Sequence, residues 1–160
     1  MQNKIILASK SKVRKEILDK NNIHCEVKRS NVDEDVVKDS LIKEKASPEI
    51  ISKNLAELKA NKVSLNQNNQ LVLGADSVID LDGELISKPE NREEALVILK
   101  KLNGKKHHLI SSVCISKNGS MIWNYTDKAE LTMKNFTEED LMHIYQKYLM
   151  KLCMLITFTK

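Results

Sequence analysis

The stretch Leu71–Pro89, LVLGADSVIDLDGELISKP, decides the fold. It begins with the apolar run Leu71–Leu73, has no side chain at Gly74, and then carries a carboxylate at Asp76 and a hydroxyl at Ser77. A short apolar run that leads into polar residues is consistent with the end of a buried strand. We therefore expect the strand to present Asp76 at its end.

A hairpin follows directly in the sequence. Val78–Leu81 predicts a second extended piece, Asp82-Gly83 suits the two positive-φ positions of a type I′ turn, and Glu84–Ile86 predicts the returning strand. Asp76 precedes the hairpin and Lys88 follows it, so a carboxylate and an ammonium could together hold a metal-bound phosphate. The alternative is that Asp76 forms a turn and Lys88 lies in a loop that leads into a helix.

Composition favours one globular domain over residues 1–160. Hydrophobic residues make up 41% of the 160 residues and charged residues 30%, which is enough apolar material for a core and argues against disorder. The 26 basic and 22 acidic residues are interleaved, and aromatic residues are only 4%, so we expect no nucleic-acid partner.

The cysteines and the N-terminus indicate a cytoplasmic protein. Cys25, Cys114 and Cys153 are far apart and odd in number, which is typical of reduced and mostly buried thiols. The apolar run Ile5–Ala8 is too short for a signal peptide, and no segment reaches the ~20 apolar residues of a membrane span.

The N-terminal residues predict an anion site. Lys4–Ala8 predicts a buried strand, and Ser11 is a good N-cap for a helix over Lys12–Lys20. A helix N-terminus beside hydroxyl groups attracts anions, and Arg14 could add a forked donor for phosphate. The alternative is that Ser11 only caps the helix and Arg14 is solvated. The sequence has no glycine-rich phosphate loop.

Acidic residues follow the strand expected over Cys25–Lys28. We expect Asp33–Asp35 to lie in a loop and Asp39–Ala46 to be a charged, mobile segment. The loop acids are either simply solvated, or Glu34 reaches a metal ion together with Asp76.

A helix is expected to begin at Ser47-Pro48-Glu49, which supplies a cap, a proline at the first position and an acid in the first turn. Lys59 lies next to the expected apolar face of this helix. It either snorkels at the edge or is directed at the site. The expected face consists of Ile51, Leu55, Leu58 and Lys62.

The second half of the chain predicts further elements. They are a helix that Asn91 caps and that ends at Gly104, strands over Leu109–Ser116 and Met121–Tyr125 joined by a hairpin turn at Asn118-Gly119, a strand over Ala129–Met133 and a helix from Thr137. We expect His107 and His108 at the exposed start of a strand. The tail Leu149–Lys160 has no clear period and predicts a closing strand, a dimer contact or a segment that does not fold.

Several of these segments together resemble one protein family, the Maf family of nucleoside triphosphate pyrophosphatases, also called septum-formation inhibitor proteins. The resemblance runs from Ile5 to about Tyr148. The segments that carry it are Leu7–Ser11 with Arg14 and Glu16–Leu18, Val32–Glu34, Leu55-Ala56 with Lys59-Ala60, Gly74–Ser77, Ser87–Pro89, Leu102–Gly104 with His107, and Ser111–Val113.

The resemblance implies an α/β fold with a mixed, twisted sheet flanked by helices around a central cleft. It also implies Mg²⁺-dependent hydrolysis of a nucleoside triphosphate, which could be a non-standard or modified one, to a monophosphate and pyrophosphate. The implied roles are water activation and metal contact for Asp76, metal contact for Glu34, and phosphate binding for Ser9, Arg14, Lys59 and Lys88. A nucleotide-binding regulator of cell division and an inactive truncated copy are the alternatives.

The sequence departs from the family pattern in three places. Lys12-Val13 stands where the family has Pro-Arg, Ser77 stands in place of the more frequent threonine, and the part from about residue 149 to 160 is atypical. We expect a nucleoside triphosphate as the substrate and no membrane partner. The atypical end leaves a homodimer as an open alternative.

Overall fold

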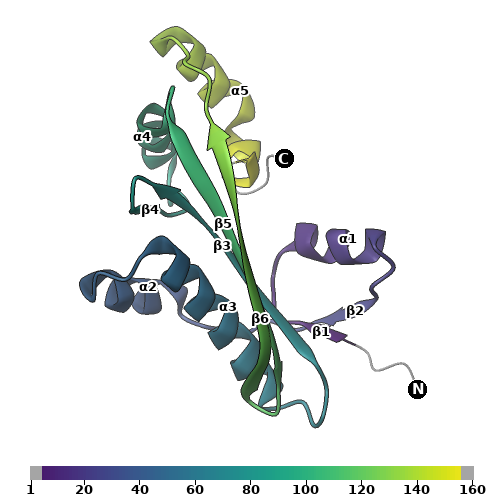
Figure 1. Cartoon of the computed structure of the whole chain (residues 1–160). Coiled ribbons are helices and arrows are strands. Elements are labelled where there is room, and N and C mark those ends of the chain that lie inside the picture. The colour runs from purple at the N-terminus through teal and green to yellow at the C-terminus, as the bar shows by residue number, and fades with distance from the viewer. Residues whose placement is uncertain (1–4, 156–160) are drawn as a thin grey trace. The chain divides into compact units, whose positions relative to one another are not determined.

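The computed structural model describes the backbone of residues 5–155 and the side chains of residues 5–147. The elements in chain order are β1 (Ile5–Leu7), α1 (Lys12–Lys20), β2 (Cys25–Val27), α2 (Glu34–Lys43), α3 (Pro48–Ser64), β3 (Val72–Leu81), β4 (Glu84–Ile86), α4 (Arg92–Leu102), β5 (Lys106–Lys117), β6 (Ser120–Thr132) and α5 (Glu138–Leu155). The strands form one sheet in the order β2-β1-β3-β5-β6, and β4 pairs with β3 (Figure 1). This confirms the predicted α/β class with a mixed sheet flanked by helices.

The chain divides into two compact units. Unit 1 consists of Met1–Asp76 and Ser111–Asp127, and unit 2 consists of Ser77–Ile110 and Lys128–Lys160. Strands β3, β5 and β6 each have one part in unit 1 and the other part in unit 2. Within the described residues, no helix is long and apolar enough to cross a membrane.

Unit 1 is built around parallel strands. β1 pairs with β2 and with β3 in parallel register, so that Ile6 lies opposite Glu26 on one side and Val72 on the other. Ile6, Val63 and Val72 pack in one buried cluster, which joins helix α3 to these strands. The short strand β1 therefore lies inside the sheet, as its apolar sequence predicted.

Helix α3 lies unusually close to β3, because Gly74 has no side chain. A Cβ atom at Gly74 would lie 2.2 Å from the Ala56 carbonyl oxygen and 2.8 Å from the Ala60 nitrogen. These are backbone atoms, which cannot turn aside as a flexible side chain could. The small side chains at positions 56 and 60 complete the close contact, and Ala56 and Ala60 also pack with Cys114.

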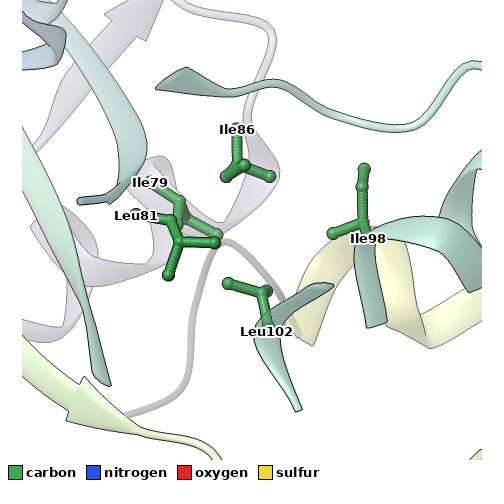
Figure 2. Packing of buried hydrophobic residues seen from close by; sticks show 5 residues of the cluster. All are labelled: Ile79, Leu81, Ile86, Ile98 and Leu102. Atoms are coloured by element: carbon green, nitrogen blue, oxygen red, sulfur yellow. The ribbon is translucent and has the colours of Figure 1, made fainter. Parts of the chain in front are cut away.

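Unit 2 has a separate hydrophobic core. Figure 2 shows Ile79 and Leu81 of β3, Ile86 of β4, and Ile98 and Leu102 of α4, which form one buried cluster. The β3–β4 hairpin turns as predicted, with φ of 52° at position 82 and 87° at position 83. Helix α4 also packs against α5.

Three of the strand boundaries predicted from the sequence are wrong. β3 continues through Asp76 to Leu81, so Asp76 lies within the strand and not at its end. β6 is one strand over Ser120–Thr132, where the sequence predicted two. Strand β5 begins at Lys106, earlier than expected, and His107 is consequently buried at its start. In each case pairing with neighbouring strands extends the element beyond the local apolar pattern.

The expected acidic loop is also wrong. Asp33 is the N-cap of α2, where its carboxylate accepts a hydrogen bond from the Val36 nitrogen at 3.3 Å. Glu34 and Asp35 then occupy the first turn, where the helix dipole favours acids. Most of the segment Asp39–Ala46, expected to be mobile, belongs to the same helix.

The buried face of α3 is shifted by about one residue position from the predicted face in the second half of the helix. Ile51 and Leu55 are buried as predicted. Leu58 and Lys62 are exposed, whereas Lys59 and Val63 are buried. The small residues of α3 face β3, and this rotates the helix relative to the face expected from its large apolar residues alone.

The C-terminal segment is helical as far as Leu155. This excludes a closing strand over residues 149–155. The side chains of residues 148–155 and all of residues 156–160 lie outside the described residues, so the expectations of a dimer contact and of an atypical end stay predictions.

Candidate active site

The turn between β1 and α1 gathers hydroxyl and basic groups. Ser11 caps α1 by accepting a hydrogen bond from the Arg14 nitrogen at 3.3 Å, as predicted. The Ser9 hydroxyl oxygen accepts from the Ser11 nitrogen at 3.1 Å and from Arg14 Nη1 at 3.4 Å. With these donors on its oxygen, Ser9 can offer its hydroxyl hydrogen to an oxygen of a ligand.

Lys59 joins two carboxylates from different elements. Its Nζ donates to Asp76 Oδ1 at 2.7 Å and lies 3.0 Å from Glu34 Oε1. Asp76 is 6% exposed and Lys59 is 5% exposed, so this contact is buried. Helix α2 presents Glu34, helix α3 presents Lys59 and strand β3 presents Asp76, all within unit 1.

The buried charges affect one another. Burial raises the pKa of the Asp76 carboxyl, while the charges of Lys59 and Arg14 and the hydrogen bond from Lys59 oppose this rise. Burial lowers the pKa of the Arg14 guanidinium, and the charges of Asp76 and Glu34 oppose that fall. Two acids and two bases therefore act on one another, and the interaction is strongest between Lys59 and Asp76, which are both buried.

Helix α3 contacts Asp76 at a second point. The Ser52 hydroxyl, which is fully buried, donates to the main-chain carbonyl oxygen of Asp76 at 3.2 Å. Ser52 is not among the site residues predicted from the sequence. The signal that could have found it is the spacing of small residues at positions 52, 56 and 60, which lie on one face of a helix.

The structure thus brings together five of the six predicted site residues. Ser9, Arg14, Glu34, Lys59 and Asp76 all belong to unit 1. The charge of Arg14 links the turn between β1 and α1 to the carboxylates of Asp76 and Glu34. Lys88 belongs to unit 2, and its part in the site stays a prediction.

Glu34 and Asp76 are the residues that could hold a metal ion. Among the side chains that the structure describes, no group of three or more His, Cys, Asp or Glu residues has the arrangement of a metal site. Mg²⁺ is commonly bound by one or two carboxylates together with substrate phosphates and water, and this pair fits that donor set.

Comparison with known proteins decides the family. Residues 4–151 match the family described as Maf-like protein. The chain belongs to the Maf family. This Maf chain is 67% identical over 147 residues to a nucleoside triphosphate pyrophosphatase of Pelagibacter ubique (strain HTCC1062). The match covers 92% of the chain and 75% of that relative. It is 38% identical over 134 residues to a nucleoside triphosphate pyrophosphatase of Ruegeria sp. (strain TM1040), over 84% of the chain and 67% of the relative.

A solved structure supports the fold of this Maf chain. The Ham1 protein of Staphylococcus aureus superposes with a TM-score of 0.50 over 80% of the chain and 69% of that protein. The sequence identity is 16%, so this likeness concerns the fold alone.

Proposed function

We propose that this chain is a nucleoside triphosphate pyrophosphatase that hydrolyses its substrate to a nucleoside monophosphate and pyrophosphate. The observation that carries the proposal is the buried contact of Asp76 with Lys59, with Glu34 and Arg14 close enough to affect the same charges. Relatives of the same family, which are named nucleoside triphosphate pyrophosphatases, support the reaction class.

The reaction needs a water molecule activated for attack on the α-phosphorus. Asp76 Oδ1 accepts from Lys59, so Oδ2 is the oxygen that takes a proton from this water. Burial raises the pKa of Asp76, which makes its carboxylate a stronger base. The water oxygen bonds to the α-phosphorus, the bond from this phosphorus to the bridging oxygen breaks, and pyrophosphate leaves with the electron pair.

The basic residues position the triphosphate. Arg14 and the Ser9 hydroxyl hold phosphate oxygens at the N-terminus of α1, where the helix dipole also favours an anion. Lys59 and Lys88 neutralise further phosphate charge. Hydrolysis at phosphorus depends mostly on such positioning and charge stabilisation.

A divalent cation, Mg²⁺ in our proposal, fits the same residues. Glu34 and Asp76 would hold it together with phosphate oxygens. The bound ion would neutralise charge on the phosphates and orient them. A cytoplasmic location, expected from the cysteines, is consistent with a nucleotide substrate.

The first test is pyrophosphate release from a panel of standard and modified nucleoside triphosphates with Mg²⁺. We expect turnover of at least one substrate by the wild-type chain and a loss of at least about 100-fold in Asp76→Asn, because the proton acceptor is removed. Asp80→Asn is the matched control, since Asp80 lies on the same strand but contacts Lys128 and the Gly83 nitrogen. It should keep wild-type turnover.

The panel also separates the rival functions. A nucleotide-binding regulator would gain thermal stability from a nucleotide without releasing pyrophosphate. A folded wild-type chain that releases no pyrophosphate from any substrate would overturn the proposal, as would full activity in Asp76→Asn.

A further inference from the structure

Ser52 contacts the main chain of Asp76 and not the carboxylate that the proposed reaction uses. The Ser52 side chain is 0% exposed, and its hydroxyl donates to the Asp76 carbonyl oxygen at 3.2 Å. The bond joins the middle of β3 to the first half of α3. A buried hydroxyl without a partner would be costly, so this bond helps to fix the distance between the two elements.

The same helix face contacts the Asp76 side chain. Lys59 follows Ser52 by seven residues, which is about two helical turns and returns to the same face. Its Nζ donates to Asp76 Oδ1 at 2.7 Å. Helix α3 therefore contacts Asp76 at its main chain through Ser52 and at its carboxylate through Lys59.

The close approach at Gly74 adds a third contact between α3 and this part of β3. Gly74 precedes Asp76 by two residues, so both lie on the same side of the strand. The Ala56 carbonyl approaches Gly74 so closely that even a methyl group would not fit. Ala56 lies between Ser52 and Lys59 on α3, so the helix touches β3 along the whole segment that carries both contacts.

We propose that Ser52 is a positioning residue for the reaction, which fixes the main chain of Asp76 so that its carboxylate meets Lys59 and the attacking water in one geometry. This inference rests on the proposed function. In the proposed function Ser9, from the turn before α1, and Arg14, from α1, hold the phosphates, and Ser52 has no part in that binding. Its role is to act through Asp76.

The proposal predicts a specific kinetic pattern for Ser52→Ala. The Asp76 carbonyl loses its hydroxyl donor, and the strand can shift at this residue. A shift of about 1 Å at a catalytic group can cost on the order of 100-fold in rate. We expect kcat to fall by about 10- to 100-fold, while KM stays within about threefold because the phosphate contacts are intact.

Ser64→Ala is the matched control. Ser64 is also a buried serine of α3, but its hydroxyl donates to the Asn61 carbonyl and accepts from the Gly119 nitrogen. If Ser52 only stabilises the fold, Ser52→Ala and Ser64→Ala should therefore lose similar amounts of stability and of activity. We expect kcat in Ser64→Ala to stay near the wild-type value at a temperature where thermal melts show each protein folded.

A spectroscopic signature tests the contact independently of activity. The ¹³C resonance of the Asp76 carbonyl should move upfield in Ser52→Ala, as expected for the loss of a hydrogen bond, and should stay in place in Ser64→Ala. Ser52→Cys keeps a side chain of similar size with a weaker donor. It should give a kcat between those of serine and alanine, and it keeps the test available if Ser52→Ala does not fold.

The outcomes separate this inference from the proposed function. If the wild-type chain releases no pyrophosphate, the proposed function fails, whereas the carbonyl resonance still tests the contact. If the wild-type chain is active, an unmoved Asp76 resonance overturns the inference. It is also overturned if kcat in Ser52→Ala is no lower than kcat in Ser64→Ala. If Ser52→Ala does not fold, the same comparison is made with Ser52→Cys.

Discussion

Lys59 is the residue on which the charge balance of the site depends. Its ammonium lies between Asp76 and Glu34, and both Lys59 and Asp76 are buried. The sequence left open whether Lys59 snorkels at the edge of its helix or is directed at the site, and in the structure its ammonium is buried against Asp76 and contacts Glu34. A buried ion pair is costly to form, but removal of one partner leaves a buried charge uncompensated.

We predict that Lys59→Met loses stability in a pH-dependent way. Burial already raises the pKa of Asp76, and removal of the lysine raises it further above the unfolded value. A carboxyl with a raised folded pKa favours folding at low pH, and this contribution is lost as the pH rises from the unfolded pKa, about 4, through the folded pKa. The deficit against wild type should therefore be small near pH 3.5 and reach about 3–5 kcal/mol near pH 7.

Urea unfolding in a metal chelator at several pH values measures this deficit. Lys62→Met is the control, because Lys62 lies one turn along the same helix, is exposed and donates to the Asn31 carbonyl. Its deficit should be below about 1 kcal/mol and should not grow with pH. A Lys59→Met deficit that shrinks as the pH rises would contradict the prediction.

At the scale of elements, the packing of α3 on β3 positions the site. Gly74 allows the backbone of α3 to lie against the strand, and positions 52, 56 and 60 carry small side chains that face it. The start and cap of α3 were predicted from Ser47-Pro48, because a cap depends on a few neighbouring residues. The buried face was predicted correctly at Ile51 and Leu55 but incorrectly at Leu58 and Lys62, because the glycine that selects it lies on another element.

We predict that Gly74→Ala is strongly destabilising for a single added methyl group. The new Cβ would lie 2.2 Å from the Ala56 carbonyl oxygen, so the helix or the strand must move. Overpacking of this kind costs about 1–3 kcal/mol. Because the same movement separates Lys59 from Asp76, turnover per folded molecule should also fall by at least about tenfold.

Gly83→Asn is the matched control on the same hairpin. Gly83 has φ of +87° but nothing within 4 Å of a built Cβ, and asparagine tolerates this conformation better than other residues. Chemical unfolding should show a loss of less than about 1 kcal/mol, with turnover unchanged. Equal losses in the two variants would show that the close approach of α3 does not limit stability.

At the scale of the whole molecule, the chain forms two units that are not continuous in sequence. The buried pair Lys59 and Asp76 lies in unit 1, whereas Lys88 lies in unit 2, which has its own hydrophobic core. The sequence predicted most elements of both units from caps, turns and apolar runs. It could not predict the division, because β3, β5 and β6 each continue from one unit into the other.

We predict that Lys88→Met weakens substrate binding without unfolding the protein. The loss of one charge-assisted phosphate contact costs about 1.5–3 kcal/mol, which corresponds to a rise in KM of roughly 10- to 100-fold. Steady-state pyrophosphate release measures this change. Lys101→Met is the control, since Lys101 forms a surface ion pair with Glu84 in the same unit, and such pairs contribute little. A KM that is unchanged in Lys88→Met would remove this residue from the phosphate site.

The sequence by itself determined the local features of this protein. Ser11, Ser47 and Asn91 cap the helices they were expected to cap, and Asp82-Gly83 and Asn118-Gly119 adopt the positive φ values expected of their turns. Each of these features depends on residues within a few positions, so the local sequence contains the physical cause.

Only the tertiary structure decided how the charges meet. The continuity of β3 through Asp76, the capping of α2 by Asp33 and the buried position of Lys59 differ from, or go beyond, what the sequence predicted. Lys59 and Asp76 are 17 positions apart, and their contact depends on how closely α3 packs against β3. That distance is determined by sterics between elements and by the cost of burying charge, neither of which is encoded in a local pattern.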